Sequence, residues 1–123
     1  MAFPKDVLGL LDRTKEVDVE THSAEGKRHR VPIWIVVDGD DVFARSWRGS
    51  TARWYRELTA RDGVLVAGRQ RIPVHAVGAV DRDSVRRTSD GYQKKYPKSD
   101  STPSMLRSEI LDTTIRLEPV DQR

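Results

Sequence analysis

Short runs of β-branched and aromatic residues, each ended by turn formers, follow one another through the first two thirds of the chain. The clearest pair, residues 29–38 and 42–47, flanks Asp38-Gly39-Asp40, a strong hairpin signal. Residues 64–68 and 72–80 make a second pair, joined by Arg69-Gln70-Arg71. Runs of this length and spacing indicate consecutive antiparallel strands.

Two further segments complete the expected sheet, and helices flank it. Residues 16–21 alternate charged and β-branched side chains, the pattern of a strand with one wet face, and residues 112–118 supply a closing strand. We therefore predict a mostly β fold with flanking helices, built on six antiparallel strands in one domain spanning residues 1–123. Its expected parts are a short N-terminal helix at 4–12, a barrel at 15–80, a helical segment at 83–110 and the closing strand. A helix over 51–62, capped by Ser50 or Thr51, interrupts the barrel segment.

Composition excludes several classes of site. The 123-residue chain has no cysteine, so it forms no disulfide and holds no thiolate metal site. Its three histidines are too scattered for a familiar metal motif, and no serine lies in a nucleophile elbow. A net charge of +3 is too mixed to imply nucleic acid, and no stretch reaches the length of a membrane span. We expect a cytoplasmic protein.

The run from Arg45 to Tyr55 joins a predicted strand to a predicted helix and gathers Arg45, Arg48 and Arg53 around Gly49. Backbone N–H groups of a first helical turn have no internal partner, and glycine lets an oxyanion approach them closely. The run therefore predicts a phosphate or carboxylate site, although a helix start with a solvated basic face would look the same.

The three tryptophans allow two kinds of ligand. Trp34, Trp47 and Trp54 could stack on bases of single-stranded nucleic acid, but the acidic strand at 16–20 and the acidic turn at 38–41 make this partner unlikely. A flavin-type cofactor requires an anion pocket for its phosphate and a flat apolar slot for its ring. Residues 30–54 offer both, unless the aromatic side chains simply pack in the core.

Several motifs occur in an order that resembles the FMN-binding split β-barrel superfamily, particularly its deazaflavin-dependent nitroreductase branch. They are Gly26-Lys27-Arg28-His29-Arg30-Val31-Pro32-Ile33-Trp34, Asp38-Gly39-Asp40, Ser46-Trp47-Arg48-Gly49 and Trp54-Tyr55. Tyr92-Gln93-Lys94-Lys95-Tyr96 and the strand Thr113-Thr114-Ile115-Arg116-Leu117 extend the likeness to a small domain family of unassigned function within that superfamily.

This resemblance implies a six-stranded split barrel, usually a homodimer, with FMN or a deazaflavin in a groove between subunits. It implies that Arg30 contacts the phosphate and that Ser46, Arg48, Gly49 and Arg53 cradle it, with Pro32, Trp34 and Trp54 beside the ring. The expected activity is transfer of hydride or electrons between the cofactor and a small-molecule substrate, an organic acceptor.

One departure from the nitroreductase branch leaves the ligand open. Where that branch has Gly-Arg-Lys-Ser-Gly, this chain has Ser23-Ala24-Glu25-Gly26, which lacks two cationic anchors for the deazaflavin tail. FMN, a truncated deazaflavin mode, haem and loss of cofactor binding are therefore all compatible with the resemblance. The alternative function is a non-catalytic binding module for a protein or single-stranded nucleic acid on the same barrel.

Overall fold

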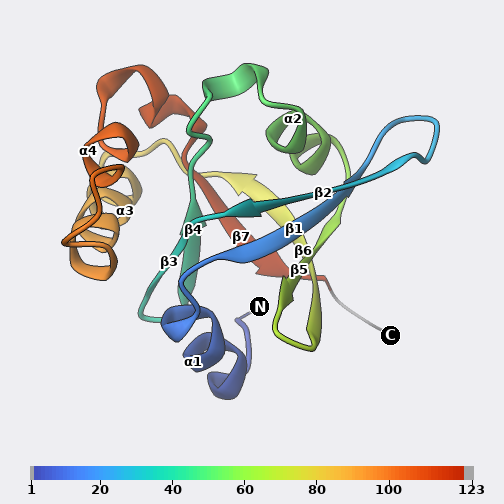
Figure 1. The fold of residues 1–123 in the computed structure, drawn as a ribbon, viewed down its shortest axis with the longest axis horizontal. Helices are drawn as coiled ribbons and strands as arrows, with labels where there is room; N and C mark the ends of the chain where they lie inside the picture. Colours follow the sequence, from blue (N-terminus) through green and yellow to red (C-terminus); the bar gives the residue numbers. More distant parts are fainter. Residues whose placement is uncertain (1, 121–123) are drawn as a thin grey trace.

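The computed structural model describes residues 2–120, and within them seven strands form one antiparallel sheet (Figure 1). The order across the sheet is β2-β1-β5-β6-β7-β4-β3. The strands are β1 (Val17–His22), β2 (Arg28–Ile33), β3 (Ile35–Asp38), β4 (Asp41–Ala44), β5 (Gly63–Ala67), β6 (Gln70–Gly78) and β7 (Ile115–Pro119). The mostly β architecture with flanking helices is confirmed.

The prediction of six strands is wrong because residues 29–38 form two strands rather than one. Trp34 alone separates β2 from β3, yet β2 pairs with β1 while β3 pairs with β4, so the two strands are the opposite edges of the sheet. The curled sheet is therefore closed by the chain at Trp34 and not by a ladder of hydrogen bonds between its edges. Pro32 lies in edge strand β2, where its missing N–H leaves no gap in an inner ladder.

The segment after β4 also differs from expectation. β4 ends at Ala44 instead of continuing to Trp47, and a short 3-10 turn, η1 (Gly49–Thr51), precedes helix α2 (Arg53–Ala60). The residue at the N-cap of α2 is Ala52, and neither Ser50 nor Thr51 caps the helix. Gly49 has a φ of 81°, a left-handed conformation that favours glycine at this turn.

Two apolar cores hold the elements together. The larger fills the barrel with inward side chains of the sheet, and helix α1 (Lys5–Arg13) adds Leu8 and Leu11 while α2 adds Leu58. The smaller lies between β3 and β4 on one side and helix α3 (Arg82–Lys95) with the following segments on the other; it includes Val36 and Tyr92. Alternate side chains of β3 thus enter different cores.

The helical segment 83–110 is interrupted in the structure. After α3 come α4 (Thr102–Met105) and a 3-10 helix, η2 (Ser108–Thr113). Gly91 lies within α3, and a Cβ added there would come within 2.9 Å of the Val36 Cβ. The glycine therefore lets α3 approach β3 closely, which places the aromatic end of α3 beside Trp34.

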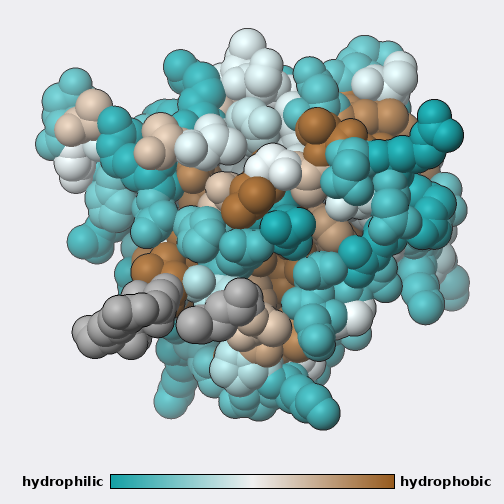
Figure 2. Space-filling model, turned by 180° about the vertical axis from the view of Figure 1, so that it is seen from behind, coloured by the Kyte–Doolittle hydropathy of each residue, from teal (hydrophilic) through white to brown (hydrophobic). Residues whose placement is uncertain are grey.

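The surface is mixed in polarity. Seen from behind, hydrophobic side chains are interspersed among hydrophilic ones instead of forming one continuous patch (Figure 2). Among residues 2–120, no helix has both the length and the apolar character required to cross a bilayer.

Candidate functional site

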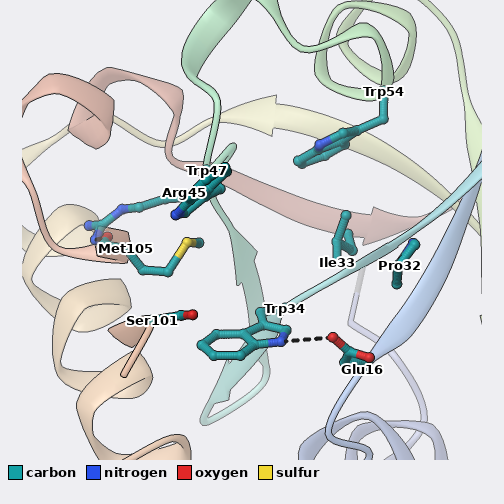
Figure 3. A pocket seen from close by; sticks show the side chains of 9 residues that line it. All are labelled: Glu16, Pro32, Ile33, Trp34, Arg45, Trp47, Trp54, Ser101 and Met105. Atoms are coloured by element: carbon teal, nitrogen blue, oxygen red, sulfur yellow. Dashed lines mark hydrogen bonds between the residues drawn. The ribbon is translucent and has the colours of Figure 1, made fainter. Parts of the chain in front are cut away.

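A cavity of about 260 Å³ opens at the junction of β2 and β3 (Figure 3). Four parts of the chain meet there: the residue before β1, the β2–β3 junction, the segment from β4 to α2, and the α4 region. The lining residues are Glu16, Pro32, Ile33, Trp34, Arg45, Trp47, Trp54, Ser101 and Met105. Three of these nine residues are tryptophans, so large aromatic side chains form much of the wall.

Trp34 is held in place from three directions. Its ring stacks on Tyr96 with 4.0 Å between centroids and planes only 8° apart. Its backbone carbonyl accepts a hydrogen bond of 2.8 Å from the Tyr92 hydroxyl, and its indole Nε1 donates to Glu16 Oε2 at 3.3 Å. Because Tyr96 covers one face of the indole, the other side is available to the cavity.

The tyrosines that support Trp34 are neutral structural groups. Burial raises the pKa of Tyr92 far above its usual range, and it raises the pKa of Tyr96 in the same direction, assisted by the negative charge of Glu16. The Tyr92 hydroxyl also accepts from the backbone N–H of Arg45 at 3.1 Å. One phenol thus connects the chain at the end of β4 to the β2–β3 junction.

Trp54 and Trp47 form the other aromatic walls and differ in exposure. Trp54 is half-buried on α2, packs against the barrel core, and meets Tyr55 edge-on at 6.1 Å. Trp47 is 52% exposed, and the guanidinium carbon of Arg107 lies 5.6 Å from its ring centroid. Figure 3 shows Trp34 and Trp54 on opposite sides of the opening, with Trp47 beside them.

Arg45 lines the cavity but its guanidinium is already engaged. The side chain is 1% exposed and donates to the Thr114 hydroxyl, the Ser89 hydroxyl and two backbone carbonyls. All of these acceptors are neutral, and burial lowers the pKa of this arginine from its ordinary value. Arg45 therefore ties the end of β4 to α3, to α4 and to the residue that follows η2, and it has little capacity left for a ligand.

The predicted phosphate loop lies next to the cavity. Ser46 is fully buried, its N–H donates to the Thr113 hydroxyl at 3.0 Å, and its Oγ has no hydrogen-bond partner in the described part of the chain. Arg48 and Arg53 are exposed, and no carboxylate of residues 2–120 forms an ion pair with either. The loop thus offers two cations within one residue of the lining tryptophans Trp47 and Trp54.

Arg30 is not among the lining residues. Its Nε donates to Asp18 at 2.7 Å, and Nη1 lies 3.5 Å from Glu20, the residue directly opposite on β1. Glu20 is 4% exposed and also forms a bidentate pair with Arg71, whose hydrogen bond holds the pKa of the Glu20 carboxyl below its usual value. Within one chain, the structure does not bring Arg30 together with Arg48 and Arg53.

The structure brings together only part of the predicted site. Pro32, Trp34 and Trp54 share the cavity wall, and Ser46, Arg48, Gly49 and Arg53 lie along the segment that contributes Trp47. Sequence reasoning missed Glu16, Ile33, Ser101 and Met105, and it named Arg45 and Trp47 for other roles. Glu16 fits the alternation of residues 16–21 and gave no separate signal, and Ser101 and Met105 come from a segment remote in sequence.

Two of the three histidines contact carboxylates. His29 Nδ1 lies 2.9 Å from a Glu57 oxygen and His75 Nε2 lies 3.1 Å from Glu118. Among residues 2–120, no group of three or more histidine, aspartate or glutamate side chains is placed to hold a metal ion.

Residues 7–117 match the family described as "Uncharacterized protein conserved in bacteria (DUF2255)". The chain belongs to the DUF2255 family. Comparison with the curated proteins finds no match.

Solved structures share the fold of this DUF2255 protein. The conserved hypothetical protein Rv2991 of Mycobacterium tuberculosis has a TM-score of 0.66 and 11% identity, over 100% of this chain and 82% of that one. The heme storage protein HutZ of Vibrio cholerae has a TM-score of 0.66 and 14% identity, over 99% and 93%. An F420-H2 dependent reductase, FDR-A, has a TM-score of 0.63 and 18% identity, over 87% and 96%. The split-barrel fold that the motifs implied is thereby confirmed, and identities this low carry the fold alone.

Proposed function

We propose that the DUF2255 protein binds a flavin-type cofactor, FMN or a deazaflavin, and acts as an oxidoreductase on a small organic acceptor. The observation that carries this proposal is the cavity itself, which three tryptophans line beside a loop whose two arginines, Arg48 and Arg53, form no ion pair within residues 2–120. The likeness to a reductase that depends on F420, a deazaflavin, supports the same ligand class. When bound, the cofactor would supply the hydride or electron transfer.

Two sets of residues fit such a cofactor: one would hold its ring and the other its phosphate. The indole of Trp34, backed by Tyr96, offers a flat surface for a fused ring, and Trp54 bounds the opposite side. Arg48 and Arg53 would bind the phosphate outside the ring slot; neither forms an ion pair with a carboxylate of residues 2–120, although the charge of Arg53 acts on Glu57, four residues along α2. The protein would orient the ring and exclude water from one of its faces.

The donor set favours a flavin over haem. The cavity wall contains the Met105 thioether but none of the three histidines, and His29 and His75 already face carboxylates. Haem iron is held by a proximal histidine in globins and peroxidases, a ligand that this wall does not offer.

The size of the cavity supports a homodimer. Its 260 Å³ is smaller than the roughly 300–1,000 Å³ of typical ligand pockets, so one chain would cover only part of the cofactor. The outer face of β5 and β6 presents the half-buried apolar residues Val64, Val66, Pro73 and Val77. A second copy on this face would bury them, and Arg30 from that copy could then complete the phosphate site.

The test is a titration of the purified protein with FMN and with F420, followed by quenching of tryptophan fluorescence and by calorimetry. We expect saturable binding, and Arg48→Ala or Arg53→Ala should each weaken FMN by about 1.5–3 kcal/mol if a charge-assisted contact is lost. Arg69→Ala is the matched control, because Arg69 is an exposed arginine in the β5–β6 turn. If neither FMN nor F420 binds at high micromolar concentration, the proposal is contradicted.

A further inference from the structure

The cavity has one polar group that can only accept hydrogen bonds. Among its lining side chains, Arg45 is committed to neutral acceptors inside the protein, and the Ser101 hydroxyl can both donate and accept. Glu16 differs from both because an ionised carboxylate has acceptor sites alone. This residue therefore decides which kind of ligand edge can lie at its end of the cavity.

Only one oxygen of the Glu16 carboxylate accepts a hydrogen bond within residues 2–120. Oε2 accepts the indole N–H of Trp34, whereas Oε1 accepts no hydrogen bond from any of residues 2–120. Figure 3 shows the carboxylate at the Nε1 edge of Trp34 and beside Pro32, with one oxygen toward the indole and the other pointing away from it. A ring that stacks on the free side of the Trp34 indole and extends past its Nε1 edge would bring its own edge next to this carboxylate.

From this arrangement we infer that Glu16 is a specificity residue that accepts a hydrogen bond from a ring N–H of the ligand stacked on Trp34. The inference rests on the proposed function, because flavins and deazaflavins both carry such a group: the pyrimidinedione N3–H. A ring with only acceptors at this edge would place lone pairs against the carboxylate and would bind poorly.

Glu16 also positions the stacking surface, so the two roles must be separated. Loss of the Glu16 hydrogen bond to Trp34 would weaken every ligand that stacks on the indole, whatever its edge. Loss of the hydrogen bond to the ligand would weaken only ligands that have the N–H. A ratio of affinities between two ligands that differ at that single atom removes the first effect.

The experiment compares riboflavin with 3-methylriboflavin, in which a methyl group replaces the N3 hydrogen. Both lack the phosphate, so the arginine loop does not contribute. In the wild-type protein riboflavin should bind about 10-fold more tightly or better, because a hydrogen bond to a charged acceptor is lost on methylation. In Glu16→Ala the ratio should fall to about 1–2, and in Glu16→Gln, which keeps one acceptor oxygen, it should lie between these values.

Glu25→Ala is the control, since Glu25 is an exposed glutamate in the β1–β2 turn and should leave the wild-type ratio unchanged. If FMN binds and the ratio is the same in the wild type and Glu16→Ala, the role of Glu16 is overturned while the proposed function stands. If none of FMN, F420 and riboflavin binds, the proposed function fails and this inference fails with it.

Discussion

Removal of the Tyr92 hydroxyl should lower the free energy of unfolding by a large amount for a single atom. The hydroxyl is fully buried, donates to the Trp34 carbonyl at 2.8 Å and accepts from the Arg45 N–H at 3.1 Å. Tyr92→Phe removes one oxygen and leaves both backbone groups without a partner. An unsatisfied buried polar group costs about 1–3 kcal/mol, so the free energy of unfolding should fall by about 2–4 kcal/mol.

Urea denaturation followed by circular dichroism would measure this loss. The matched control is Tyr55→Phe, because the Tyr55 hydroxyl makes no hydrogen bond within the described residues and its removal should change stability by less than about 0.5 kcal/mol. The slope of the transition should be unaltered, since the surface exposed on unfolding is the same. Equal stabilities for the two variants would refute the assignment of Tyr92 as the bridge between the end of β4 and the β2–β3 junction.

Two other perturbations have defined signs. Gly91→Ala should destabilise the protein by about 1–2 kcal/mol, because the clash of the new Cβ with Val36 outweighs the gain in helix propensity. Gly9→Ala in α1 is the control: its Cβ meets only the end of a flexible arginine, so this variant should be neutral or stabilising. Thermal melts of both variants measure the effects, and a Gly91→Ala protein that melts no lower than Gly9→Ala would contradict the prediction. Lys95 donates to two backbone carbonyls, and burial lowers its pKa from 10.5 to about 8. Between pH 8 and pH 10 the unfolded chain then holds the proton that the folded chain has released, so the stability of the wild type relative to Lys95→Met should rise with pH. A relative stability that stays flat or falls over that range, measured by urea denaturation at each pH, would show that the carbonyls hold the proton on Lys95.

The sequence predicts the fold well where local signals and tertiary structure agree. The Gly39-Asp40 turn joins β3 to β4 as expected, and residues 70–78 pair with 63–67. It fails at Trp34, since Val31, Ile33, Ile35 and Val37 keep strict alternation and all contact the same core on both sides of the break. A change of hydrogen-bonding partner without a change of periodicity leaves no trace in the sequence, so one strand was predicted instead of two.

The residues of the site also fall into those that the sequence could predict and those that it could not. Aromatic residues near the β2–β3 junction and the start of α2 could be anticipated, because they lie in strongly patterned segments. The pairing of Arg30 with acidic residues could not, since it depends on the register that sets Glu20 opposite Arg30 across two strands. Likewise, Met105 reaches the cavity only because α3 and the following loop return the chain to Trp34, a consequence of packing over about 70 residues of sequence separation.

The position of Trp34 between the two sheet edges has an implication for how this architecture can change over time. Main-chain bonds that stabilise the barrel run along the other strand pairs, whereas the cavity wall at this seam consists of side chains and short connections. Exchanging the exposed side chains of this wall, such as Pro32 and Trp47, would alter what the cavity accepts while leaving the strand ladders intact. New ligand preferences could then arise by point substitution at these positions with little loss of stability, whereas the buried Arg45 would stay fixed.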